Sequence, residues 1–192
     1  MRKSRAQTAE TRQRIVSNAS RLFLTKGLAS VGTRDIMAAS DVVQGGFYRH
    51  FESKEQLIAE AYQATVDHVF AMFEEAIDGK SPKDAIEAIV TMYLSQSPTM
   101  SEVDLCPLSA LGSELKHEEK CIRDIAMLGH QRFVDLIKAQ LTLLGLPQAR
   151  IVAMGVISSL VGAVTLAGIS PHQATANEIL RDAREYILRD II

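Results

Sequence analysis

Apolar residues recur at helical intervals along most of the chain, and we find no convincing alternation of the kind that strands require. A first amphipathic helix is predicted over residues 12–27, where a glycine ends it. Its apolar stripe consists of Ile15, Ala19, Leu22 and Phe23. The pattern therefore predicts an all-α protein in which each helix buries one face.

Residues 33–57 form two short amphipathic segments around a tight turn. The positions predicted to be buried are Ile36, Ala39, Val43, Phe47 and Phe51, which follow helical spacing within each segment. Thr33 is a good residue type for the N-cap of the first segment, and Asp35 suits the positive end of a helix. The stretch therefore predicts two short helices that share one small core.

The outward positions of the same stretch carry cations and hydrogen-bond donors, namely Arg34, Gln44, Tyr48, Arg49, His50 and Lys54. These groups suit phosphates, and Gln44 and Arg49 can also read the edges of adenine or guanine. This separation of buried apolar residues from outward polar and basic residues favours a helix-turn-helix that inserts its second helix into a DNA groove. The alternative is an ordinary helical bundle whose polar face is merely solvated.

Charge is divided unevenly along the chain. Residues 1–54 hold 10 Lys and Arg against 4 Asp and Glu, whereas residues 55–192 hold 11 against 19. A basic head on an acidic body concentrates at a polyanion such as DNA while the body is repelled from it. Arg2, Lys3 and Arg5 form either an N-terminal arm that contacts phosphates or the minor groove, or a solvated tail.

These residues resemble the TetR family of bacterial transcriptional regulators, which are all-helical homodimers. The resemblance covers residues 1–57. The positions that carry it are Lys26-Gly27, Thr33, Asp35-Ile36, Ala38-Ala39, Phe47-Tyr48, His50-Phe51, Lys54 and Leu57.

The resemblance implies a three-helix helix-turn-helix domain over residues 1–53 and a helical effector-binding and dimerisation domain over residues 54–192. The implied DNA-binding residues are Thr33, Arg34, Gln44, Gly45, Gly46, Tyr48, Arg49, His50 and Lys54. Of these, Thr33 and Arg34 are expected at the DNA backbone and residues 44–49 in the major groove. Tyr48, His50 and Lys54 are expected to hold phosphates.

The chain departs from the family pattern in the turn and at the start of the second helix. Asp41 replaces the usual glycine, so we expect a slightly strained turn with positive φ. Val43 replaces the usual Ser or Thr and removes a side-chain cap worth about 1 kcal/mol. Gly45 and Gly46 weaken the helix further, although they let the backbone approach DNA closely. We therefore expect a recognition helix that is partly frayed and orders on DNA.

Beyond residue 54 the sequence predicts further helices. Their expected ranges are 55–77, 82–95, a helix opening at Cys106-Pro107, 118–144, 151–169 and 173–191, with a polar loop over 97–104. The resemblance implies an effector pocket among these helices, but this part of the chain carries less specific motifs than the head.

Residues 151–169 contain no charge and are long enough to span a membrane. Their glycines, serines and threonine lower the hydrophobicity, and no Lys or Arg cluster flanks them to set an orientation. Small residues also allow close helix packing, and the resemblance implies a dimer interface built from the late helices. We favour a homodimer through residues 148–191 over a membrane-associated adaptor.

Cys106 is the candidate effector or sensor residue. A helix N-terminus lowers the pKa of a thiol and makes it more reactive, whereas Glu102 and Asp104 oppose the thiolate. The two interpretations are a buried pocket-wall residue, which we favour, and a redox or electrophile sensor. Glu114, His117 and Cys121 have metal-ligand side chains at helical spacing, yet a solvated helix face explains them better, and no metal is predicted.

No phosphate loop, nucleophile elbow or metalloprotease motif is found, so no enzyme activity and no cofactor are expected. The N-terminus lacks the apolar core of a secretory signal, which favours a cytoplasmic protein. The sequence thus predicts a homodimeric repressor that binds a near-palindromic operator and is released by a small-molecule effector. Activation instead of repression stays open, as do the operator and the effector.

Overall fold

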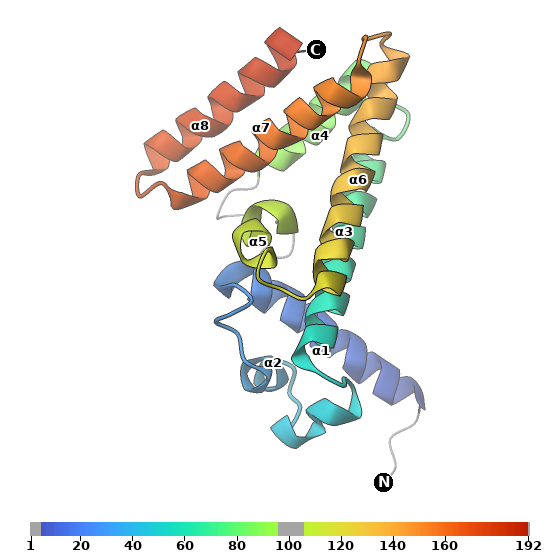
Figure 1. Ribbon diagram of the computed structural model, residues 1–192, viewed down its shortest axis with the longest axis vertical. Coiled ribbons are helices and arrows are strands. Elements are labelled where there is room, and N and C mark those ends of the chain that lie inside the picture. Colours follow the sequence, from blue (N-terminus) through green and yellow to red (C-terminus); the bar gives the residue numbers. More distant parts are fainter. Residues whose placement is uncertain (1–4, 96–105, 192) are drawn as a thin grey trace.

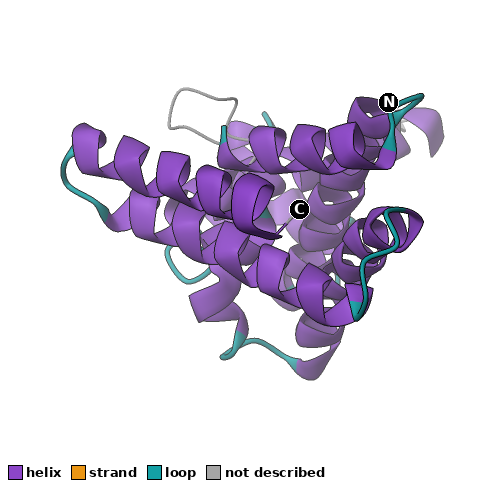
Figure 2. Ribbon diagram, turned by 90° about the horizontal axis from the view of Figure 1, so that it is seen from above, coloured by secondary structure: helices purple, strands orange, loops and turns teal. Residues whose placement is uncertain are grey.

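The computed structural model describes residues 5–95 and 106–191, and within these ranges the protein consists of helices and loops without strands (Figure 2). The elements in chain order are α1 (Arg5–Lys26), α2 (Thr33–Ala39), the 3-10 helix η1 (Gln44–Arg49), α3 (Lys54–Ile77), α4 (Pro82–Leu94), α5 (Pro107–Leu115), α6 (Lys120–Leu143), α7 (Ala149–Ile169), α8 (Gln173–Glu185) and the π-helical end η2 (Tyr186–Ile191). The all-α prediction is confirmed.

The elements α1, α2 and η1 form a small head at one end of the molecule, and α7 and α8 lie at the opposite end (Figure 1). The predicted stripe of α1 is buried in the core, as are Ile36, Phe47 and Phe51 from the helix-turn-helix. The rings of Phe47 and Phe51 lie 5.6 Å apart between centroids, so η1 is anchored from inside. The buried residues of the head are continuous with the core of the body.

The long helix α3 connects the head with the body, where it packs beside the equally long α6 (Figure 1). The side chain of Ser53 caps α3 by accepting a hydrogen bond from the Gln56 N–H at 3.1 Å. The first turns of α3 pack on α1, where the Ser20 hydroxyl donates to the Ala61 carbonyl at 3.0 Å. Because α3 packs on the head and continues into the body, a boundary at residue 53 stays a prediction.

The centre of the body is aromatic. Phe73 of α3 stacks on Phe133 of α6 with ring centroids 5.1 Å apart, and Tyr93 of α4 stacks on the same ring at 5.6 Å. Phe70 meets both phenylalanines edge-on. These stacked and T-shaped ring pairs hold α3, α4 and α6 together, and each ring buries a large apolar area.

The predicted body helices agree with the structure to within a few residues at each end. Pro82 is the first residue of α4 and Ser81 is its cap, as the sequence indicated. The first helix is longer than predicted, since it begins at Arg5 instead of residue 12. The predicted loop over 97–104 and the basic residues Arg2 and Lys3 lie outside the described residues.

Candidate nucleic-acid interface

The turn between α2 and η1 determines how the second helix leaves the first. Asp41 has φ of 52°, so the positive φ expected at this position is confirmed. The N–H of Val42 bonds back to the Met37 carbonyl at 3.0 Å and closes the turn. The N-cap of α2 is Gly32, so the assignment of Thr33 as the cap was wrong. Asp35 instead reaches back and accepts a hydrogen bond from the Gly32 N–H at 3.1 Å.

The second element, η1, is a short 3-10 helix. Val43 occupies its N-cap with extended backbone and provides no side-chain hydrogen bond, as expected from the missing Ser or Thr. A 3-10 turn needs fewer residues than an α-helical turn, and Gly45 and Gly46 disfavour a regular α-helix. Phe47, which is buried in the core, anchors this element.

The face formed by α2 and η1 presents most of the predicted DNA-binding residues to solvent. Arg34, Gln44, Gly45, Tyr48 and Arg49 are exposed, Thr33 and His50 are half-buried, and Gly46 is buried. Tyr48 is 81% exposed although its ring contacts Phe47 edge-on. The structure thus brings one cation-rich, donor-rich surface together, but Gly46 faces the core instead of lying on that surface.

Lys54 has a different position from the one the sequence suggested. Its ammonium donates a hydrogen bond to the Leu28 carbonyl at 2.8 Å and ties the start of α3 to the loop between α1 and α2. The side chain is half-buried, so it serves the architecture of the head. A phosphate contact from Lys54 stays a prediction.

Val43 was placed on the buried face by its spacing from Ile36, and this prediction was wrong. Val43 is 81% exposed, and Ala39 is exposed as well. The turn at Asp41 breaks the helical periodicity, so the spacing of α2 does not continue into η1. Val43 therefore joins the outer surface at the start of η1, where an isopropyl group can contact a thymine methyl.

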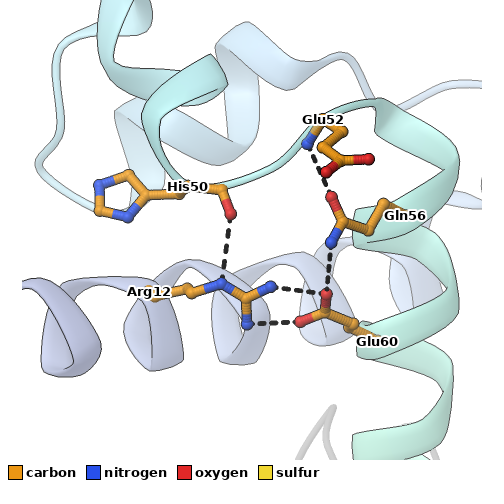
Figure 3. A network of polar contacts seen from close by, with 5 residues as sticks. All are labelled: Arg12, His50, Glu52, Gln56 and Glu60. Atoms are coloured by element: carbon orange, nitrogen blue, oxygen red, sulfur yellow. Dashed lines mark hydrogen bonds and ion pairs between the residues drawn. The ribbon is translucent and has the colours of Figure 1, made fainter.

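A polar network beneath this surface fixes the end of η1 (Figure 3). Arg12 of α1 forms a two-pronged ion pair with Glu60 of α3, with N–O distances of 2.5 and 2.6 Å. The Nε–H of Arg12 also donates to the His50 carbonyl at 3.2 Å, and its guanidinium lies 4.6 Å from the Phe51 ring centroid. Gln56 donates to the Glu60 carboxylate and accepts from the Glu52 N–H. One arginine thus joins α1, the end of η1 and α3.

A small cavity lies in the body between α3, α5 and α6. Its volume is about 20 Å³, enough for one water molecule, and its walls are apolar and aromatic. The lining includes Tyr62, Phe70, Cys106, Leu108 and Phe133. The hydroxyl of Tyr62 is buried and has no hydrogen-bond partner among the described residues. Leu108 and Ala126 also line an open groove of about 580 Å³ between α5 and α6, so the two spaces share a wall.

Cys106 stands at the N-cap of α5, as predicted, but it is only 4% exposed. Burial raises the pKa of its thiol, and the Tyr93 hydroxyl and the backbone N–H groups of Leu108 and Ser109 oppose this effect only in part. The expectation that the helix start lowers this pKa was therefore wrong, because desolvation outweighs the helix end. The predicted countercharges Glu102 and Asp104 lie outside the described residues. Glu114, His117 and Cys121 belong to the described part of the chain, where no group of three potential metal ligands is found.

The outer face of α7 is apolar and open, while its inner face packs against α4, α6 and α8. Ile151 is 67% exposed, Leu166 53% and Ile169 73%. A Cβ added to Gly155 or Gly162 would meet no atom within 4 Å. Among the described residues, α7 is the one helix that is long and apolar enough to cross a membrane. Its most apolar 18-residue stretch has a mean hydropathy of 2.1, and 28% of that stretch is buried.

Comparisons with known proteins agree on one family. Residues 15–61 match the family of bacterial regulatory proteins named tetR. The HTH-type transcriptional repressor KstR2 of Rhodococcus jostii is 32% identical over 81 residues, which span 42% of this chain and 40% of the repressor. An uncharacterized HTH-type transcriptional regulator of Mycobacterium tuberculosis is 25% identical over 94% of this chain and 95% of its own length.

Among solved structures, a TetR transcriptional regulator from Chloroflexus aurantiacus superposes with a TM-score of 0.83 and 28% identity, covering 96% of this chain and 97% of that one. Escherichia coli NemR in its reduced form has the same fold, with a TM-score of 0.82 and 19% identity, covering 93% of this chain and 95% of that one. The matched head, the exposed face of α2 and η1 and the full-length fold lead to one conclusion: the chain belongs to the TetR family and is a DNA-binding transcriptional regulator.

Proposed function

We propose that the protein is a homodimeric repressor that binds a near-palindromic operator and is released by a small-molecule effector. The observation that carries this proposal is the surface of η1, where Gln44 and Arg49 are exposed while Phe47 holds the element in the core. A side chain that reads bases needs a fixed backbone and a free end, and this element provides both. One relative, KstR2 of Rhodococcus jostii, is itself a transcriptional repressor.

The DNA contacts follow from the exposed side chains. Arg34 and Tyr48 are suited to phosphates, together with Thr33 and His50. Gln44 and Arg49 are suited to base edges, and Val43 adds an apolar contact for a thymine methyl. Gly45 leaves room for the backbone to approach the groove, since no atom lies within 4 Å of an added Cβ. The head thus combines positioning and reading groups on one face.

The apolar face of α7 supports a second copy of the chain as partner. Ile151, Gly155, Leu166 and Ile169 follow one another at helical spacing and stay exposed in the single chain. A two-fold axis lets the same face serve both subunits, and the glycines allow the two helices to approach closely. Tyr186, which begins η2 directly after α8, is 51% exposed and is a further candidate for this interface. Dimerisation through residues 148–191 places two heads on one DNA duplex.

We assign the effector to the cavity beneath α5 and its neighbouring groove. Aromatic and aliphatic side chains line the cavity, and Tyr62 offers one buried hydroxyl, so the site suits a predominantly apolar molecule with one hydrogen-bond acceptor. A cavity of about 20 Å³ must widen toward the groove to admit such a molecule, and this couples binding to a movement of α5. Buried Cys106 is a wall of this site, and the redox alternative gains no support from its raised pKa. We place the protein in the cytoplasm.

Selection of genomic fragments tests this proposal. Purified full-length protein is mixed with fragmented DNA of its source organism at moderate salt, and the bound fragments are sequenced. A few sites that share a near-palindrome are expected, and the genes beside them indicate the effector class. Even enrichment across the genome would show only charge-driven binding and would contradict a specific repressor.

A further inference from the structure

Glu114 joins the body to the head through a contact that spans 85 residues of sequence. It lies in the last turn of α5, and its carboxylate accepts a hydrogen bond from the Ala29 N–H at 3.0 Å. Ala29 belongs to the loop between α1 and α2, directly before the helix-turn-helix. A charge-assisted bond to a backbone N–H is stronger than a neutral one and fixes the position of the loop.

Gly27 leaves the space that this contact needs. Its φ is +84°, and a Cβ at this position would lie 2.5 Å from the Glu114 Oε1. The neighbouring Leu28 carbonyl accepts a hydrogen bond from Lys54 of α3 at 2.8 Å. The loop is therefore held from two sides, by α5 and by α3, and neither contact involves the surface that faces DNA.

The other end of α5 reaches α7. The Thr165 hydroxyl of α7 lies 3.4 Å from the Ser109 carbonyl and 2.8 Å from the Val161 carbonyl, so the two acceptors share its proton. In addition, α5 packs against α7 as well as α1. Figure 1 shows α5 between the head and the α7–α8 end of the molecule. One short helix thus lies between the loop of the head and the helix whose outer face we assign to the dimer.

We propose that Glu114 is a positioning residue that sets the orientation of the head relative to the dimer interface, and so determines which spacing of half-sites the protein binds. This inference rests on the proposed dimeric function. A dimer gains affinity from its second head only if both heads match the spacing of the two half-sites. Loss of the Glu114 contact frees the loop and spreads the head over several orientations, but leaves the surface of each head unchanged.

The test compares three DNA duplexes made from the recovered site: the whole operator, one half-site, and the operator with two added base pairs between half-sites. Wild-type protein and the variant Glu114→Ala are titrated against each by fluorescence anisotropy. We expect Glu114→Ala to lose about ten-fold in affinity for the whole operator, a part of the gain from bivalency, and less than about two-fold for the half-site. It is also expected to discriminate less against the altered spacing.

Two further variants separate the contact from charge and stability. Glu114→Gln keeps a side-chain oxygen that accepts from the Ala29 N–H, so it should retain most of the wild-type preference for the whole operator. Glu118→Gln removes a charge from the neighbouring turn without touching the loop and should bind as the wild type does. Circular dichroism and thermal unfolding check that all variants are folded.

The outcomes are distinct. An unchanged ratio of whole-operator to half-site affinity in Glu114→Ala overturns the inference alone, and so does an equal loss on both duplexes, which indicates damage to the head itself. A wild-type protein that binds the whole operator no more tightly than the half-site overturns the proposed dimeric function, and this inference with it.

Discussion

At the scale of single residues, the most consequential positions are those where backbone conformation and a distant side chain act together. Gly27 combines a left-handed φ with close contact to Glu114, whereas Gly79 has φ of +67° and open space around it. A substitution at Gly79 therefore costs backbone strain alone, whereas a substitution at Gly27 costs backbone strain and the displacement of a neighbouring side chain. Neither effect can be read from the residue type alone.

We predict that Gly79→Ala lowers the free energy of unfolding by about 1 kcal/mol, the cost of a Cβ in the left-handed region. Gly27→Ala should lower it by about 2 kcal/mol or more, because the new methyl also displaces the Glu114 carboxylate from Ala29. Urea unfolding monitored by circular dichroism measures both. Equal losses in the two variants would contradict a stabilising contact at Glu114.

Glu118 gives a prediction that depends on pH. Burial raises the pKa of its carboxyl, the neighbouring carboxylates of Glu114, Glu55 and Glu119 add to the effect, and Lys54 opposes it. A raised pKa in the folded state means that the ionised form is disfavoured there. The protonated carboxyl therefore favours folding. This contribution is complete below the unfolded pKa and is lost as the pH rises through the folded value.

Glu118→Gln should therefore raise the free energy of unfolding at pH 7, by less than about 1 kcal/mol because solvent screens the charge. The advantage over wild type should shrink when the pH is lowered to 4. Urea titrations at both pH values measure the difference. A variant less stable than wild type at pH 7 would mean that the attraction of Lys54 for Glu118 outweighs burial and repulsion.

At the scale of elements, η1 is the least regular part of the head. The side chain of Ser53 caps α3 with a hydrogen bond, whereas Val43, at the N-cap of η1, provides no side-chain hydrogen bond. The substitution Val43→Ser supplies the missing acceptor and removes only an exposed isopropyl group. We predict about 1 kcal/mol of local stabilisation, which slows amide exchange at Gly45 and Gly46 about five-fold in free protein. Strong protection of these amides in the wild type would contradict a frayed η1.

The elements themselves were largely predictable. Helical periodicity, Pro82 at the start of α4 and the glycine after α1 are local signals, and the structure confirms the helices that they indicated. The face of Val43 was not predictable in this way, because the turn at Asp41 breaks the period between α2 and η1. The spacing of apolar residues predicts which positions are buried within one helix. It does not predict them beyond a turn, because the turn changes the direction of the chain.

At the scale of the whole molecule, the proposed homodimer forms through the exposed apolar face of α7. We predict that Gly155→Arg raises the dissociation constant of the dimer by about a hundredfold or more, since a buried unpaired charge costs several kcal/mol. Gly112→Arg is the matched control, because Gly112 is an exposed helical glycine on α5 with no atom near its Cβ position. Sedimentation velocity distinguishes the species. A Gly155→Arg protein that remains dimeric would show that the dimer forms through another surface.

The sequence by itself determined the helical class, the basic head, the turn at Asp41 and the residue types that can read DNA, because each depends on neighbours within a few positions. Only the tertiary structure decided that Gly46 is buried, that Lys54 binds the Leu28 carbonyl, and that burial raises the pKa of Cys106. It also brought Glu114 to Ala29 across 85 residues. Burial and long-range hydrogen bonds depend on how helices pack, and no local period in the chain encodes that packing.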